Sequence, residues 1–329
     1  MIRPADLRDL GLLRRMREHG LCLDSQLAYT RGAHTFQTLF LDLITPGSST
    51  FTLIAKPSEE GEQAALGQIL HRLGDPHARL SVIGPQEILA ETRGSKLLDG
   101  LADAAGERGA HHLIAEVDEN NPVFESLRRA GYAIYARQRI WILEDTQKGN
   151  PTSRNGPWRR TESADEEAII HLYQNLVPAM VQQVEVPPRP KKGDVVHYAE
   201  GELLGYLDIE RGPLGVWVQP YLHPAAQSPA APLDSFIKGY SDSRKRPLYF
   251  SVRSYQGGVM HGLERLGFAF HRDQAVMVKH LAVLIRHPAL KPLPAGDGTR
   301  AEPTTPFAHS NSFPIRVESQ SIPHSSQQL

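Results

Sequence analysis

The chain has 329 residues, 40% of them hydrophobic, which is enough apolar material for two domains that each bury a core. Its 36 Lys and Arg against 37 Asp and Glu give a net charge of -1, which argues against nucleic-acid binding, because that depends on clustered cations. The single cysteine, Cys22, excludes an intramolecular disulfide and favours a reducing, cytoplasmic compartment. We expect no signal peptide, and no apolar run approaches the roughly 20 residues of a membrane-spanning helix.

The first part of the chain predicts a mixture of helices and strands. Apolar residues at helical spacing begin at Leu7, after Asp6 as a cap. Two later runs of apolar residues at helical spacing end at Gly109 and Gly131, and glycine is the usual residue in the left-handed conformation that caps a helix C-terminus. In chain order we expect helices over 7–16 and 36–43, strands over 51–55, 64–70 and 80–83, a helix over 97–105, a strand over 113–117, a helix over 123–130, and a strand pair over 132–135 and 139–143.

Residues 147–157 are polar and turn-rich, which predicts a linker, and the pattern then restarts. We therefore expect domains at 1–146 and 158–287. Residues 288–329 are rich in Pro, Ser, Thr and Gln and predict a disordered tail. The second domain is expected to contain a helix over 168–176, strands over 203–209 and 215–222, a helix over 233–240, a strand over 248–252, a helix over 259–266, and strands over 268–270 and 275–278.

Two segments of the chain are near copies of one another, 136 residues apart. Residues 127–134 read LRRAGYAI, and residues 263–270 read LERLGFAF. Each copy closes a predicted helix at a glycine and begins a strand. A duplicated helix-glycine-strand unit predicts two related domains on one polypeptide.

The order of the segments resembles the GNAT fold of acyl-CoA N-acyltransferases. The motifs that carry the resemblance are RGSKLL (93–98), ERGA (107–110) and residues 127–132 in the first half, and LHP (222–224) and residues 263–268 in the second. The opening IRPAD is similar to the family's first strand and helix entry, and residues 159–165 echo it. The resemblance covers most of residues 1–282. It implies an α+β fold (α/β, three layers) of two tandem GNAT-like domains, each a mixed twisted sheet flanked by helices.

In that family acyl-CoA lies where two parallel strands splay, and its pyrophosphate rests on a glycine-rich loop at a helix N-terminus. The resemblance therefore implies acetyl-CoA or another acyl-CoA as cosubstrate. Both loops depart from the pattern, because Glu91 would place a carboxylate near the phosphates and Pro229 and Pro232 lack N–H donors. The cofactor-binding residues implied are Arg93, Gly94, Ser95, Lys96 and Asn120 in the first half and Gln227, Ser228 and Ala230 in the second.

The family's proton donor is missing from both halves. Many members have a Tyr four residues before the glycine that ends the last helix, and the matching positions here are Leu127 and Leu263. Tyr135 and Tyr255 are candidate substitute acids, with ordinary packing as the alternative for each.

Glu116 is the candidate general base. It alternates with Ala115 on a predicted strand and so is able to face the gap and deprotonate an amine. The alternative is a salt bridge at the rim with Arg128 or Arg137.

Two functions are compatible with these residues. One is acyl-CoA-dependent transfer of an acyl group to a small amine, by direct attack on the thioester. The other is a non-catalytic, degenerate pair that binds a ligand or a protein partner. The histidines and cysteine lack His-x-x-x-His or Cys-x-x-Cys spacing, so no metal site is expected. The expected partner is a small-molecule amine and not a nucleic acid or a membrane, and a homodimer is left open.

Overall fold

The computed structural model describes residues 2–9, 11–12, 20–32, 49–57, 64–144, 157–224, 230–240 and 242–281. The described strands are β1 (Ile2–Pro4), β2 (Leu21–Cys22), β3 (Thr50–Ala55), β4 (Ala65–Leu70), β5 (His77–Gly84), β6 (His112–Val117), β7 (Ala133–Leu143), β8 (Trp158–Arg160), β9 (Val195–Ala199), β10 (Glu202–Arg211), β11 (Val216–Leu222), β12 (Leu248–Arg253) and β13 (Ala269–His280). The described helices are α2 (Ser25–Thr30), α4 (Thr92–Glu107), α5 (Pro122–Arg129), α6 (Glu166–Leu176), α7 (Ala179–Gln182), α8 (Ala230–Gly239) and α9 (Gly257–Arg265), with 3-10 turns η1 (Leu7–Asp9), η3 (Gln86–Ala90) and η4 (Ser163–Asp165).

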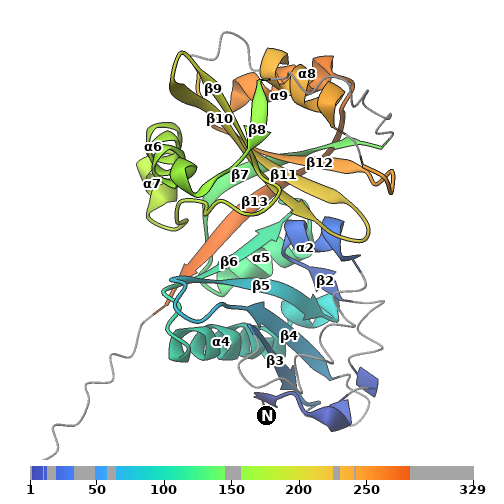
Figure 1. Ribbon diagram of the computed structural model, residues 1–329. Coiled ribbons are helices and arrows are strands. Elements are labelled where there is room, and N and C mark those ends of the chain that lie inside the picture. Colours follow the sequence, from blue (N-terminus) through green and yellow to red (C-terminus); the bar gives the residue numbers. More distant parts are fainter. Residues whose placement is uncertain are drawn as a thin grey trace, which may run out of the picture. The chain divides into compact units, whose positions relative to one another are not determined.

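One mixed sheet runs through both halves of the chain (Figure 1). Its strands follow the order β1-β3-β4-β5-β6-β13-β7-β12-β11-β10-β9-β8, and β2 pairs with β5 beside this path. The last strand of the second half, β13, lies between β6 and β7 and pairs antiparallel with both. Strand β7 pairs in turn with β12. The two halves therefore exchange strands where they meet.

Strands β7 and β13 are each continuous, so the predicted strand pair over 132–135 and 139–143 was wrong, as was the break between the predicted strands 268–270 and 275–278. The polar residues between the apolar runs suggested turns, but they pair across the ladder instead. Gln138 lies opposite Gln274, and its side-chain amide donates to the Gln274 Oε1 at 3.0 Å. Both side chains are buried, so their mutual hydrogen bond satisfies groups that would otherwise be costly in the sheet.

Helices cover both faces of the sheet in three layers, as the alternation of side chains along the strands shows. On β6, Leu113 packs with α4 and α5, whereas the next residue, Ile114, packs with α6 and α7. On β11, Val218 packs with α8 and α9, whereas Trp217 stacks on Tyr29 of α2 with ring centroids 5.7 Å apart. One face therefore carries α4, α5, α8 and α9 and the other carries α2, α6 and α7. The predicted three-layer fold is confirmed.

On the face that carries α2, α6 and α7, helices from each half of the chain pack against the other half. The N–H of Leu214, in the β10–β11 turn, donates to the carbonyl of Thr30 at the end of α2 at 3.0 Å. A Cβ on Gly212 would collide with the same carbonyl, so this turn needs a glycine to accept α2. In the opposite direction, α6 and α7 of the second half bury Ile114 and Tyr135 of the first.

Equivalent Arg–Asp ion pairs, here called clamps, lie at the start of the two halves of the chain. In the first half Arg3 and Asp9 approach to 2.6 Å, and in the second half Arg159 and Asp165 approach to 2.6 Å. The carboxylate of each clamp also accepts a main-chain N–H, from Asp6 in the first half and from Glu162 in the second. The echo between residues 2–6 and 159–165 therefore corresponds to a shared local structure.

The second clamp predicts a loss of stability in acid. The hydrogen bond from Arg159 lowers the pKa of Asp165 from 3.8 to about 2. A carboxylate whose pKa is lower in the folded than in the unfolded protein stabilises the fold fully at pH values above its unfolded pKa. That stabilisation is lost as the pH falls through the folded pKa. We expect the urea midpoint of the wild type to fall between pH 4 and pH 2. Asp165→Asn should be less stable at pH 7 and fall less over that interval, and an equal decrease in both proteins would contradict the assignment.

Several predictions fall on residues outside the described ranges. They are the helix over 36–43, the linker except for Pro157, and the tail over 288–329. The described residues form one compact unit by their contacts. The division into 1–146 and 158–287 stays a prediction.

Candidate functional site

The first gap lies between β5 and β6, which run parallel and then separate. They pair only from His77 to Arg79 on β5, and the main chain of Leu23 enters beyond that point. The Leu23 N–H donates to the carbonyl of Ser81 at 2.9 Å, and its own carbonyl accepts from the Glu116 N–H at 2.8 Å. The main chain at Leu23 therefore occupies the place where the resemblance puts acyl-CoA.

The loop after β5 contains η3, which packs against α4. A Cβ on Gly94 would lie 2.5 Å from the Cα of Leu89, so main chain already fills the space above this glycine. The N–H groups of Gly94 and Ser95 both donate to the carbonyl of Glu91, at 3.1 and 3.3 Å. The Arg93 guanidinium pairs with the Glu91 carboxylate at 3.1 Å. Two amides and one cation predicted to hold a pyrophosphate are thus engaged with Glu91.

Glu116, the predicted base, faces the α2 side of the sheet and is 4% exposed. Its Oε2 accepts from the Ser25 N–H at 2.9 Å and from the Gln138 amide at 3.0 Å, and its Oε1 accepts from Arg79 at 3.3 Å. Burial raises the pKa of Glu116, but the charges of Arg79 and Arg253 outweigh burial and the net shift is downward. A carboxylate held by three donors with a lowered pKa is poorly suited to accept a proton.

The alternative prediction, that Glu116 forms a salt bridge at the rim with Arg128 or Arg137, was wrong. Arg128 pairs with Glu125 at 3.1 Å, and Arg137 pairs with Glu119 at 2.6 Å. The ion pair that Glu116 makes is buried, because its partner Arg79 extends from the neighbouring strand β5.

Arg79 also ties the start of α2 to the sheet. Its guanidinium lies 3.7 Å from the carboxylate of Asp24, which caps α2 by accepting the Leu27 N–H at 3.0 Å. Burial raises the pKa of Asp24, and the charge of Arg79 offsets part of that rise. The next residue, Ser25, donates its hydroxyl to Gln274 at 2.7 Å. The segment that fills the first gap is therefore anchored by a buried polar network.

The second gap lies between β11 and β12, which pair only as far as Val218. The side chain of Gln256, the first residue before α9, lies across it. Its Nε2 donates to the carbonyl of Pro220 at 2.7 Å, and its Oε1 accepts from the Arg253 N–H at 3.3 Å. An amide of the chain thus spans each gap, from the main chain in the first half and from a side chain in the second.

Tyr135, the predicted substitute acid, belongs to a buried cluster near this second gap. Its hydroxyl donates to the Glu185 Oε1 at 2.6 Å, and Arg253 forms an ion pair with the same oxygen. Arg253 is 2% exposed, and its Nε and Nη1 have no partner among the described residues. Burial raises the pKa of Tyr135 and the Glu185 carboxylate raises it further, so the phenol is a weaker acid than usual.

The remaining described residues implied by the resemblance lie on separate elements. Lys96 is exposed on α4, Asn120 is exposed after β6, Ala230 begins α8, and Gln227 and Ser228 lie outside the described residues. Leu127 and Leu263 are both fully buried, so neither position of the missing acid opens to a ligand.

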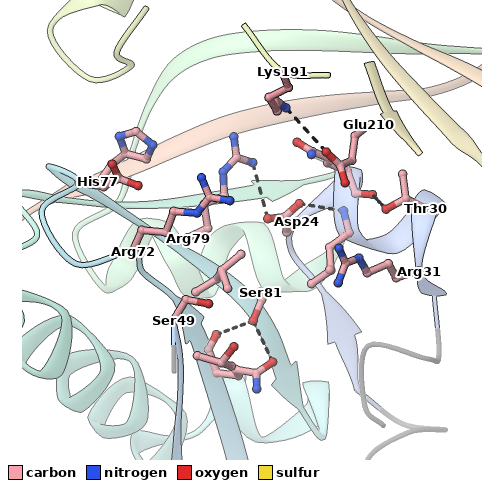
Figure 2. Close-up of a pocket in the computed structure, with 16 residues that line it drawn as sticks. Asp24, Thr30, Arg31, Ser49, Arg72, His77, Arg79, Ser81, Lys191 and Glu210 are labelled. Carbon is pink, nitrogen blue, oxygen red and sulfur yellow. Dashed lines mark hydrogen bonds and ion pairs between the residues drawn. The ribbon is translucent and has the colours of Figure 1, made fainter. Parts of the chain in front are cut away.

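A cavity of about 540 Å³ lies on the face of the sheet that carries α2 (Figure 2). Strands β4 and β5 form its floor, α2 forms one wall, and a loop and strand of the second half form another. The lining side chains are mostly polar or charged: Asp24, Gln26, Leu27, Thr30, Arg31, Ser49, Thr50, Gln68, Leu70, Arg72, Asp75, His77, Arg79, Ser81, Lys191 and Glu210. Figure 2 shows Arg79 directed toward Asp24 and Lys191 toward Glu210.

This cavity was not predicted from the sequence. Its residues come from five separate segments, and no motif joins them. The alternation of His77, Arg79 and Ser81 along β5 was the available signal, since polar residues at every second position mark a strand face that is not packed into an apolar core.

Within the described ranges, no group of three or more His, Cys, Asp and Glu side chains is placed to hold a metal ion. In the same ranges, no helix combines the length and the apolar character needed to cross a membrane.

No protein-family model matches the chain, and no curated protein matches it. It is similar to a solved GCN5-related N-acetyltransferase from Sphaerobacter thermophilus, with 13% identity and a TM-score of 0.51 over 85% of this chain and 95% of that one. A putative acetyltransferase from Pyrococcus horikoshii has 12% identity and a TM-score of 0.48, over 86% and 90% of the two chains. A tandem GNAT protein from the clavulanic acid biosynthesis pathway, solved without AcCoA, has 14% identity and a TM-score of 0.47, over 85% and 98%.

A similarity at such low identity establishes the fold alone. The evidence for the fold is the match to the Sphaerobacter protein together with the order of the strands and helices. The same order of elements occurs from β1 to β7 and again from β8 to β13, and the clamps at residues 3–9 and 159–165 lie at equivalent places in the two halves. The chain has the fold of the GNAT acetyltransferases, repeated in tandem.

Proposed function

We propose that this protein is a non-catalytic ligand-binding module built from two degenerate GNAT folds. The observation that carries the proposal is the closure of both gaps by amides of the chain itself, the Leu23 peptide in one half and the Gln256 side chain in the other. Acyl-CoA needs such a gap to reach the sheet, and these amides would have to be displaced before it entered.

The chemistry of the surrounding residues supports the same conclusion. A proton donor is missing where the family has one, because Leu127 and Leu263 are buried and apolar. Glu116 has a lowered pKa and three hydrogen-bond donors. General acid–base groups typically contribute factors of about 10²–10⁴ each, so a site without them would turn over slowly even with acyl-CoA bound.

A second candidate function is acyl-CoA-dependent N-acyl transfer to a small amine by the second half. One observation favours it: the second gap is spanned by a single side chain, and a side chain can rotate away more readily than the anchored main chain of the first half. In this function an amine would attack the thioester carbonyl directly, with positioning as the main source of rate.

Titration with acetyl-CoA and with CoA separates the two functions. We expect no saturable heat in calorimetry and no rise in melting temperature at millimolar ligand, because both gaps are closed. A GNAT enzyme known to bind acetyl-CoA provides the positive control.

Saturable binding in either gap would contradict the closure that carries the proposal. If acetyl-CoA binds, release of free thiol with a panel of amines would establish the transferase. Gln256→Ala should then strengthen binding, since it removes the amide that spans the second gap.

A further inference from the structure

The cavity beside α2 contains two cations that are not engaged with the described residues. Arg31 follows the last residue of α2, and Arg72 follows β4. Both side chains are exposed at the rim. Neither guanidinium has a hydrogen bond or an ion pair with any residue in the described ranges. Each therefore presents its donors to whatever enters the cavity.

The deeper cations of the cavity are each paired with two carboxylates. Arg79 lies between Asp24 and Glu116, at 3.7 and 3.3 Å. Lys191 lies 2.8 Å from Asp208 and 3.7 Å from Glu210. Asp75 is the remaining acid of the lining. At the rim the two guanidinium groups outnumber the Asp75 carboxylate, whereas carboxylates are in excess deeper in the cavity, so an anion is favoured at the rim alone.

We propose that this cavity binds a small organic anion with two or more acidic groups, held at the rim by Arg31 at the end of α2 and by Arg72 between β4 and β5. This inference rests on the proposed binding function. Guanidinium groups on two different walls suit a ligand with acids at two points, because each forms charge-assisted, fork-shaped hydrogen bonds with a carboxylate or phosphate. A volume of about 540 Å³ is that of a site for a metabolite-sized molecule.

The inner wall offers neutral groups for the rest of such a ligand. Gln68 and Ser81 lie on neighbouring strands and hydrogen-bond one another, the Ser81 hydroxyl donating to the Gln68 side chain at 3.1 Å. His77 has a pKa lowered by burial and by the charge of Arg79, so its ring is neutral at pH 7. These groups donate or accept hydrogen bonds without adding charge.

The test is calorimetry of the full chain with citrate, succinate and inorganic pyrophosphate as probes, at constant ionic strength. Acetate, with one acidic group, and choline, a cation, serve as comparison ligands. We expect at least one of the three probes to bind saturably and more tightly than acetate, and choline not to bind. Arg31→Gln and Arg72→Gln should each weaken that binding about tenfold or more, the effect of one lost charged hydrogen bond.

The matched control is Arg265→Gln, which removes an exposed arginine from α9 on the opposite face of the sheet. It should leave binding unchanged, and melting temperatures should confirm that all three variants are folded. The proposal is overturned if no probe binds, or if Arg265→Gln weakens binding as much as the rim variants do. Failure here, with no binding of CoA, would overturn the anion site and leave the proposed binding function standing. CoA binding that Arg31→Gln and Arg72→Gln weaken would take place in this cavity through the phosphates, whereas CoA binding that both variants leave unchanged would overturn the closure of the gaps on which the proposed function rests.

Discussion

Gly94→Ala is expected to lower the free energy of unfolding by about 1–3 kcal/mol, the usual cost of forcing an extra carbon into a packed site. The new Cβ would lie 2.5 Å from the Cα of Leu89 and would collide with the carbonyl oxygen of Ile88. Both neighbours are main chain, so they cannot rotate away as a flexible side chain would. Urea unfolding followed by circular dichroism measures the effect.

Gly100→Ala, in the same helix, is the matched control. A Cβ there would meet side-chain atoms of Ile2 and Leu53 at 3.5 Å, an ordinary contact. Alanine in a helix interior is better than glycine by about 0.5–1 kcal/mol, so this variant should be as stable as the wild type or more so. If Gly94→Ala is equally stable, η3 moves away from α4 easily and the glycine is free for a phosphate ligand after all.

Glu185→Gln is expected to destabilise the protein by about 3–5 kcal/mol, because it removes the charge that compensates a buried guanidinium. Arg253 is 2% exposed and has its ion pair with Glu185. Two of its nitrogens already lack partners among the described residues, so the remaining contact matters more than in a fully bonded pair. Thermal and urea unfolding measure the loss.

The double variant Glu185→Leu with Arg253→Met tests the cause. Replacement of both members of a buried ion pair by apolar residues is often close to neutral, so the double variant should recover most of the loss. Tyr135→Phe removes one hydrogen bond to the same carboxylate and should cost about 1.5 kcal/mol. A double variant as unstable as Glu185→Gln would show that packing, and not charge, holds this cluster together.

The sequence predicted the elements whose periodicity is long and regular. The helix over 97–105 lies within α4, the strand over 113–117 lies within β6, and the echo of 127–134 in 263–270 marks equivalent helix-to-strand corners. These segments have an apolar face along most of their length, so local pattern and burial agree. The GNAT fold followed from their order.

The closure of the gaps was not predictable in the same way. Strand β2 has two residues, too few to show any alternation, and its partners on β5 are about 60 positions away in the sequence. The role of Gln256 depends on the main-chain position of Pro220, which no side-chain pattern encodes. The residues that decide the function are thus fixed by tertiary contacts.

The insertion of β13 between β6 and β7 has a consequence for biosynthesis. A nascent chain that ends before residue 269 has β6 and β7 without their shared neighbour, so both present open edges to solvent. Such edges are templates for pairing with other chains, so open strand edges of this kind favour aggregation of incomplete chains. The sheet of the first half closes only when the final strand has left the ribosome.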